Sequence, residues 1–253
     1  MLYRAKELSK YKLKGKDGKI GSAKEFYFDD NYWAIRYLVA DTGNWLMGRQ
    51  VLISPYSLVA ISEKDESIIV NLTEKEIEEC PPLDSDKPVS RQFEESYFDY
   101  FKLPAYWNGR YMWGAWPYLM REEQVPVEDN EEKESWDPHL RSTKSVAGYH
   151  IQAKDGVIGH VEDFIVDDET WAIRYLVIDT KKLWGGKEVL ISPRWIDRIS
   201  LDEAKVFVNI PQELIKDAPE YTDDLILSRA YEEKLHQHYS QKGYWMDESV
   251  DNK

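Results

Sequence analysis

WAIRYLV, residues 33–39, occurs a second time without a change as residues 171–177. Five further runs recur at the same spacing, 138 residues later and without a gap: DG from Asp17, IG from Ile20, DD from Asp29, DT from Asp41 and VLISP from Val51. Two copies are too few for a solenoid or a propeller, which stack many short units. The sequence therefore predicts two like domains.

Each copy is predicted to consist of short strands separated by turns. Apolar and charged residues alternate over 11–14, and a polar Asp-Gly turn then leads into an extended run over 19–28, which is a hairpin pattern. Residues 33–41 are predicted to form the central strand, with one face in the core and the other partly wet. Further strands are expected over 51–53, 58–62 and 67–72, and the second copy repeats the pattern over 149–210. This pattern favours a mainly β fold in which each copy closes into a small barrel.

Helical segments are predicted to follow each set of strands. Thr73 and Glu76 have the spacing of a capping box, which predicts a short helix that ends before Pro81. A longer helix is expected from Ser90 to Phe101. Its apolar stripe is predicted to contain Phe93, Tyr97, Tyr100 and Phe101, with Tyr231, Leu235, His238 and Tyr239 as the counterparts.

The repeat boundaries divide the chain into three parts. Residues 1–107 are expected to form the first domain and residues 139–253 the second, each large enough to bury a core. Residues 108–138 have no counterpart in the repeat. Their first half, NGRYMWGAWPYLM, is rich in aromatic residues, and their second half is acidic and is predicted to be a linker.

The chain has 47 acidic and 33 basic residues, a net charge of −14. An excess of negative charge repels phosphate backbones, so we do not expect nucleic acid as a partner. Residues 1–24 are a local exception, with eight cations against Glu7 and Asp17. This basic stretch has three interpretations: a solvated face, a contact with the acidic linker within or between chains, or a surface that docks on an anionic partner.

The sequence contains no run of about 18 apolar residues that would span a bilayer, and MLYRAKELSK at its start lacks the apolar core of a signal peptide. We therefore expect a cytoplasmic protein without a transmembrane segment. The single cysteine, Cys80, excludes an internal disulfide and is expected to be inert.

The pattern DGKIG, residues 17–21, followed by WAIRYLVADTGNWLMGRQVLISP, residues 33–55, resembles the PRC-barrel family. Both copies match the family pattern over nearly their whole length, and the ending Tyr106-Trp107, repeated as Tyr244-Trp245, is similar to that of bacterial tandem members. The family is named for the cytoplasmic domain of the photosynthetic reaction centre H subunit and includes the C-terminal barrel of a bacterial ribosome maturation factor. The resemblance implies two tandem barrels that act as non-enzymatic docking or assembly modules, with peripheral contact to a membrane complex as one setting.

The sequence shows no pattern of catalytic or metal-binding residues. The pairs Asp29-Asp30 and Asp167-Asp168 are interpreted as turn residues because the spacing of a calcium loop is missing. The five histidines do not have zinc-ligand spacing, and neither a nucleophile elbow nor a Cys/His pair is present. We therefore expect no catalytic residue, no metal and no cofactor.

Trp, Tyr and Arg are the residue types that dominate interface hot spots. The inserted segment concentrates them, and we expect residues 108–120 to bury against the second barrel or a twin chain, or to be the partner surface. Arg36 and Arg174 stand in the middle of the central strands, either paired with an acid such as Glu25 or Asp163 or available for a bidentate contact. The candidates for partner contact are Arg110, Tyr111, Trp113, Trp116, Arg36 and Arg174.

These observations lead to one main hypothesis and two alternatives. The main hypothesis is a non-enzymatic scaffold or assembly module that binds another protein through paired barrels, with a homodimer as one form of that assembly. The first alternative is a small-ligand sensor whose site lies between the two barrels near Arg36, Arg174 or the tryptophans. The second is hydrolytic or metal-dependent catalysis, which clustered carboxylates with a bound metal would favour.

Overall fold

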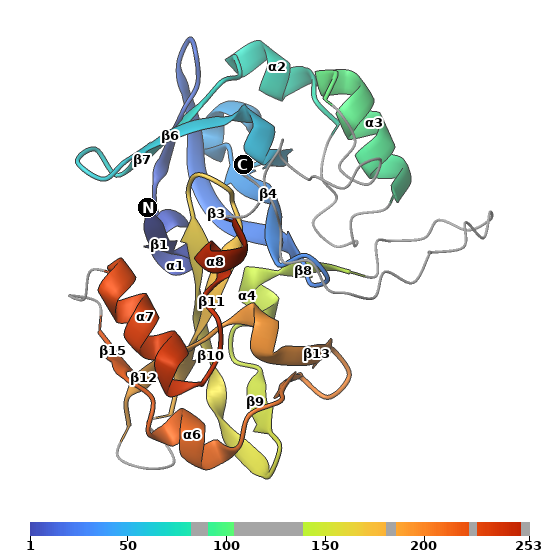
Figure 1. Ribbon diagram of the computed structural model, residues 1–253. Helices are drawn as coiled ribbons and strands as arrows, with labels where there is room; N and C mark the ends of the chain where they lie inside the picture. Colours follow the sequence, from blue (N-terminus) through green and yellow to red (C-terminus); the bar gives the residue numbers. More distant parts are fainter. Residues whose placement is uncertain (82–90, 104–138, 181–185, 223–226, 249–253) are drawn as a thin grey trace. The chain divides into compact units, whose positions relative to one another are not determined.

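A computed structural model of the chain describes residues 1–81, 91–103, 139–180, 186–222 and 227–248 (Figure 1). Four of the candidates for partner contact, Arg110, Tyr111, Trp113 and Trp116, and the acidic linker lie outside the described residues. Contacts divide the chain into unit 1, with Met1, Tyr3–Thr143 and Asp168–Ala172, and unit 2, with Leu2, Lys144–Asp167 and Ile173–Lys253. Residues 139–143, which the sequence analysis assigned to the second domain, lie with unit 1.

Unit 1 contains a mainly antiparallel sheet with the strand order β5-β4-β3-β2-β7-β6 (Figure 1). The strands are β2 (Lys12–Lys14), β3 (Lys19–Asp29), β4 (Ala34–Asp41), β5 (Gln50–Ile53), β6 (Leu58–Ser62) and β7 (Ser67–Val70), and β8 (Leu140–Ser142) pairs with β3. The short β1 (Leu2–Arg4) and α1 (Ala5–Leu8) precede them, and α2 (Glu74–Glu79) and α3 (Arg91–Phe101) follow. Within the described part of unit 1, β2 and β7 pair in parallel and the other paired strands are antiparallel.

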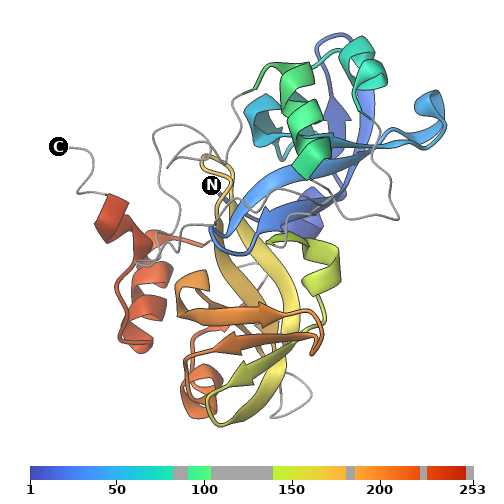
Figure 2. The same cartoon turned by 90° about the vertical axis from the view of Figure 1, so that its right-hand side faces the viewer.

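Unit 2 has the same order of strands, β12-β11-β10-β9-β14-β13, with the short β15 added beside β12 (Figure 2). The strands are β9 (His150–Ala153), β10 (Gly156–Asp167), β11 (Ile173–Asp179), β12 (Glu188–Ile191), β13 (Ile196–Ser200), β14 (Lys205–Val208) and β15 (Glu220–Tyr221). The helices are α4 (Thr143–Val146), α6 (Gln212–Lys216), α7 (Arg229–His238) and α8 (Tyr244–Glu248). The strand positions confirm the prediction of a mainly β fold.

Both sheets are open in the part of the chain that the structure describes. The strand order ends at β5 and β6 in unit 1 and at β13 and β15 in unit 2, and no pairing among the described residues joins the two ends. The mainly β class is therefore observed, whereas closure of each sheet into a barrel is not. Within the described ranges, no helix has the length and apolar character needed to cross a membrane.

The central strands are more deeply buried than their alternation of residue types suggested. Every residue of β4 from Ala34 to Ala40 is buried, including Arg36, so the prediction of a partly wet second face was wrong. Ile35 and Ile173 are both fully buried, as two hydrophobic cores require. Helix α3 covers one face of this strand, where Tyr37 and Val39 pack against Tyr97 and Phe98.

The helices begin where the sequence predicted, and the long helices bury part of the predicted stripe, namely Tyr97, Leu235 and Tyr239. The Thr73 side chain and Glu76 form the expected capping box at the start of α2. In α7, Glu232, Leu235, His236 and Tyr239 are buried, while Tyr231 and His238 are only half-buried. In α3, Glu94, Tyr97 and Phe98 are buried, Tyr100 is half-buried, and the side chain of Phe93 lies outside the described part. Each helix also places an acidic residue in the core, Glu94 or Glu232, which the predicted stripe did not include.

Candidate functional site

Arg36 and Arg174, the two candidates for partner contact in the described part of the chain, each form a buried ion pair within their own unit. Nη2 of Arg36 lies 2.5 Å from Oδ2 of Asp29, and Nη2 of Arg174 lies 2.7 Å from Oδ2 of Asp167. Both arginines are at most 5% exposed. The paired acids are seven residues earlier in the chain, at the end of the neighbouring strand, and are not Glu25 or Asp163. This geometry favours the structural interpretation of both arginines.

A second pair of buried contacts joins the sheet to the long helix of each unit. The Tyr37 hydroxyl donates to Glu94 at 2.7 Å, and the Tyr175 hydroxyl donates to Glu232 at 2.8 Å. Both carboxylates are at most 2% exposed. The sequence analysis did not predict this pair. The sequence does contain a signal for this pair, because Glu94 and Glu232 occupy the same position in the two copies of the repeat.

In unit 2 the buried carboxylate belongs to a larger polar network. Glu232 also accepts from the Tyr244 hydroxyl at 2.9 Å and lies 3.0 Å from Nη1 of Arg229. Burial raises the pKa of Glu232 despite these partners. The Tyr175 hydroxyl also lies 3.1 Å from Nε2 of His236. Because Glu232 is closed off from solvent, the network joins helix to sheet and does not present a group to a substrate.

Burial lowers the pKa of His236 to about 4, so the ring is neutral at pH 7. Its Nδ1 lies 2.9 Å from the carbonyl oxygen of Lys242, which can only accept, so Nδ1 carries the proton. Nε2 therefore carries no proton, and it competes with Glu232 for the single proton of the Tyr175 hydroxyl. Unit 1 has Phe98 at the equivalent position.

The two units differ most on one sheet surface, where three neighbouring strands bring equivalent residues together. In unit 1, Lys12 pairs across the sheet with Ser22, which pairs with Asp41. In unit 2, the same positions are held by His150, His160 and Asp179. Cross-strand partners leave the sheet on the same face. Each unit therefore presents one row of polar side chains, with different chemistry.

A glycine at the start of each long strand makes this surface possible. Gly21 and Gly159 have φ angles of 151° and 139°, a conformation that L-residues with a side chain rarely adopt. A Cβ atom on Gly21 would lie 2.0 Å from the carbonyl oxygen of Asp41, and one on Gly159 would lie 2.3 Å from that of Asp179. Only glycine allows the two strands to approach so closely at this point.

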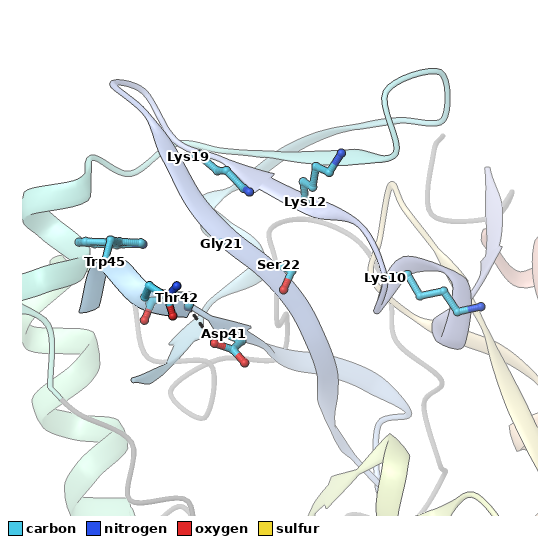
Figure 3. Close-up of a pocket in the computed structure, with 10 residues that line it drawn as sticks. Lys10, Lys12, Lys19, Gly21, Ser22, Asp41, Thr42 and Trp45 are labelled. Atoms are coloured by element: carbon cyan, nitrogen blue, oxygen red, sulfur yellow. Dashed lines mark hydrogen bonds between the residues drawn. The ribbon is translucent and has the colours of Figure 1, made fainter. Parts of the chain in front are cut away.

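In unit 1 the surface is an open pocket of about 490 Å³ lined by lysines (Figure 3). We define the lysine surface as Lys10, Lys12, Lys19, Ser22, Asp41 and Trp45. Among the described residues, the ammonium groups of Lys10, Lys12 and Lys19 make no ion pair. The Trp45 indole nitrogen donates to the carbonyl oxygen of Ile20 at 2.6 Å, which fixes the ring while 39% of the residue stays exposed.

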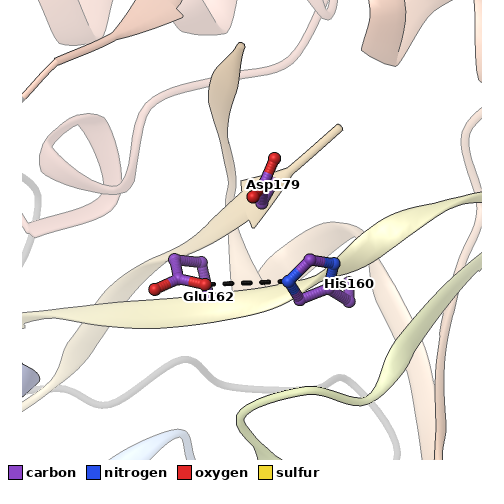
Figure 4. A group of neighbouring side chains, drawn as sticks. All are labelled: His160, Glu162 and Asp179. Carbon is purple, nitrogen blue, oxygen red and sulfur yellow. Dashed lines mark ion pairs between the residues drawn. The ribbon is translucent and has the colours of Figure 1, made fainter. Parts of the chain in front are cut away.

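In unit 2 the surface carries an imidazole and two carboxylates instead of lysines (Figure 4). We define the His–acid cluster as His160, Glu162 and Asp179. Their ligand atoms all lie within 4.8 Å of one another, and Nε2 of His160 lies 3.7 Å from Oε2 of Glu162. The sequence analysis expected no metal site, and no short motif signals this group, because strand register brings Asp179 to the other two.

Comparison with known proteins identifies the class of fold. Residues 146–215 match the PRC-barrel domain family, from the end of α4 through the strands β9 to β14 and into α6. The chain therefore contains a PRC-barrel domain in its second copy, which confirms the family resemblance for this stretch. No curated protein matches the sequence.

Proposed function

We propose that the protein is a non-enzymatic binding module made of two tandem PRC-barrels, and that unit 1 docks an acidic protein partner on the lysine surface. The tandem arrangement is supported by the equal strand order of the two units and by registers that agree position for position, such as Ser22 with Asp41 and His160 with Asp179. The observation that carries the docking surface is the set of three lysines around one open pocket, which make no ion pair with the residues that the structure describes.

A protein suits this surface better than a nucleic acid. Trp45 is 39% exposed within the pocket, and Met47, two residues later, is 99% exposed. Exposed aromatic and sulfur-containing side chains beside cations are typical of protein interfaces. The net charge of −14 repels a phosphate backbone over the rest of the molecule, whereas a compact acidic patch is attracted only by the local lysines.

The buried polar groups support a binding role more than a catalytic one. Glu94 and Glu232 are closed off in the helix–sheet contacts, and the two arginines are paired inside their units. These groups stabilise the modules and leave binding to the outer surface. The cytoplasm is the proposed location, and the aromatic segment 108–120 remains a predicted second contact, either with a partner or in a homodimer.

The test compares two triple variants in which three lysines are replaced by glutamate. Lys10→Glu, Lys12→Glu and Lys19→Glu alter the lysine surface, whereas the control changes Lys64, Lys154 and Lys234, which are exposed elsewhere. Both variants change the net charge equally. Each protein is used to capture partners from an extract of its native cell, and the partners are quantified by mass spectrometry.

We expect the wild type and the control to capture at least one acidic protein. The amount captured should fall about tenfold with the lysine-surface variant, since each exposed ion pair contributes roughly 0.2–1 kcal/mol and the variant replaces attraction by repulsion. The capture should also weaken as salt rises from 50 mM to 500 mM. Equal capture by both variants would show that the lysine surface is not the docking site.

A further inference from the structure

We propose that the His–acid cluster of unit 2 binds one divalent transition-metal cation, of which Zn²⁺ is the representative. This inference does not depend on the docking surface proposed for unit 1. It rests on a group of three side chains of the types that such cations prefer, one imidazole and two carboxylates, held together on one sheet surface.

The distances in the cluster suit a shared ion. Ligand atoms that lie about 2.0–2.2 Å from one Zn²⁺ are roughly 3.0–3.5 Å apart from each other. Nε2 of His160 and Oε2 of Glu162 are 3.7 Å apart, and all three ligand atoms lie within 4.8 Å. Small side-chain rotations close the remaining gap. The cluster can therefore take up an ion without a change in the backbone.

The ligands come from two neighbouring strands, β10 and β11, whose register shifts between Val161 and Asp163. His160 and Asp179 are direct cross-strand partners on β10 and β11. Glu162 lies within this register shift, and its carboxylate approaches the His160 ring, with Oε2 3.7 Å from Nε2 (Figure 4). A site built on strands keeps its ligands closer to the binding geometry than a site built on loops.

His150 is placed to provide a fourth ligand. It is the cross-strand partner of His160 on β9, so its side chain leaves the same face, and it is exposed. The next residue along the row is Lys205, whose Nζ lies 3.5 Å from Oε2 of Glu203. The lysine charge is thus already engaged with an acid, which limits its repulsion of a cation.

The kind of ligand selects the kind of metal. Two carboxylates and one or two imidazoles suit Zn²⁺, Mn²⁺, Fe²⁺ and Co²⁺, whereas Ca²⁺ and Mg²⁺ prefer sites made only of oxygen. All three residues of the cluster are half-buried. The ion would be held at the surface, with water in its remaining coordination positions.

Unit 1 provides an internal control for this inference. The positions of His160 and Glu162 are occupied there by Ser22 and Lys24, and the position of His150 by Lys12. Lysine is charged at neutral pH and has no lone pair to offer a metal. The equivalent surface of unit 1 keeps Asp41 alone and cannot form the site.

The experiment titrates Zn²⁺ into the metal-free, tag-free full chain and measures binding by calorimetry, with Co²⁺ absorption as a second readout of imidazole and carboxylate ligands. Two variants import residues of unit 1, Glu162→Lys and His160→Ser. Glu213→Lys, on an exposed position of α6, is the control with the same change of charge. Circular dichroism and the melting temperature of the metal-free proteins verify that each variant is folded, and His160→Ser serves if the lysine variant is not.

We expect the wild type and Glu213→Lys to bind one Zn²⁺ per chain at the same affinity. Glu162→Lys and His160→Ser should each weaken that binding at least tenfold and change the Co²⁺ spectrum, because each removes a direct ligand and even outer partners of ligands contribute tenfold or more. If the wild type binds no Zn²⁺ at 100-fold excess over micromolar protein, or if the two variants bind it as well as the wild type, the proposed site does not exist.

Discussion

Lys12, Ser22 and Asp41 in unit 1 stand at the same positions of the repeat as His150, His160 and Asp179 in unit 2. The backbone beneath them is the same, down to a glycine of unusual φ at the start of each long strand. One surface is cationic and the other offers imidazole and carboxylate groups. The difference shows that side chains on this part of the sheet can change their chemistry while the register stays fixed.

The interior of the two units shows the opposite behaviour. The Arg36–Asp29 pair returns as Arg174–Asp167, with the partners seven positions apart in both cases. The tyrosine–glutamate contact between sheet and helix is also repeated. These polar groups are buried, so losing one partner leaves a charge or a hydrogen-bonding group without water. We infer that the buried pairs are constrained by stability and the surface row by binding.

The largest expected effect comes from breaking a buried pair in one unit. Arg36→Met should lower the free energy of unfolding of unit 1 by about 3–5 kcal/mol, because Asp29 then stays buried without its cation. Arg174→Met should lower the free energy of unfolding of unit 2 by a smaller amount, since the Asp167 side chain is 13% exposed and that of Asp29 is 7% exposed. Peptide-resolved hydrogen exchange in increasing urea reports the two units separately.

The exposed Arg198→Met is the matched control, because its guanidinium is 51% exposed and pairs with Glu203 at the surface. It should change stability by less than about 1 kcal/mol. If Arg36→Met lowers the free energy of unfolding as little as the control does, the buried ion pair stabilises the fold no more than the exposed one.

The second prediction concerns the buried histidine that only unit 2 has. Burial holds the pKa of His236 at about 4 in the folded chain, against about 6.5 in an unfolded one. As the pH falls below 6.5 the unfolded chain takes up the proton first, so unit 2 loses stability between about pH 6.5 and 4, by about 3 kcal/mol at pH 4. His236→Phe, which installs the residue of unit 1, should remove this loss.

The measurement is the urea midpoint of each unit at pH 7, 5.5 and 4 for wild type and His236→Phe. The variant also loses the hydrogen bonds to Tyr175 and Lys242, so its stability at pH 7 should fall, while its dependence on pH becomes flatter. His150→Phe, at an exposed site, should keep the wild-type pH dependence. If His236→Phe loses stability as steeply as the wild type when the pH falls, groups other than His236 cause the effect.

The sequence predicted the elements of each unit well, because local signals specify them. The repeated runs place β4 and β11, the Asp-Gly turn precedes the long strand of each copy, and Thr73 with Glu76 starts α2. The family match to residues 146–215 follows from the same strand and turn pattern. These features depend on neighbours in the chain and need no knowledge of tertiary contacts.

The features that the sequence analysis missed are set by contacts between strands or between helix and sheet. Asp29 instead of Glu25 pairs with Arg36 because the turn between the strands brings it over the guanidinium. Asp179 joins His160 only through the register of β10 and β11. The helices turn Glu94 and Glu232 inward because each finds a tyrosine hydroxyl there, which residue type alone does not indicate.

A third prediction transfers the metal site between the units and therefore rests on the inference for unit 2. Lys12→His, Ser22→His and Lys24→Glu give unit 1 the residues of the unit 2 surface. The Zn²⁺ stoichiometry should rise from one to two per chain. Unit 1 should be stabilised by about 1.4–2.7 kcal/mol at free Zn²⁺ of 10–100 times its Kd.

The control for that triple variant carries Asp41→Asn in addition. This change removes the carboxylate of unit 1 that is equivalent to Asp179 of unit 2. It should return the stoichiometry to one. If the triple variant binds a single Zn²⁺ although the wild type binds one in unit 2, the backbone of unit 1 does not hold the ligands as unit 2 does, and the two surfaces are less equivalent than their registers indicate.

The smallest expected effect is that of an exposed difference with no role in binding. Lys14 and Asp65 form an ion pair at 3.5 Å with side chains 46% and 57% exposed, and unit 2 has Gln152 and Glu203 at these positions. Lys14→Gln should change the free energy of unfolding of unit 1 by less than about 0.5 kcal/mol, because water screens such pairs. Urea unfolding in low salt, where screening by ions is weakest, gives the variant its best chance of showing a loss. A loss above about 1 kcal/mol would place this exposed pair among the stabilising contacts and would weaken the separation between a constrained interior and a freely varying surface.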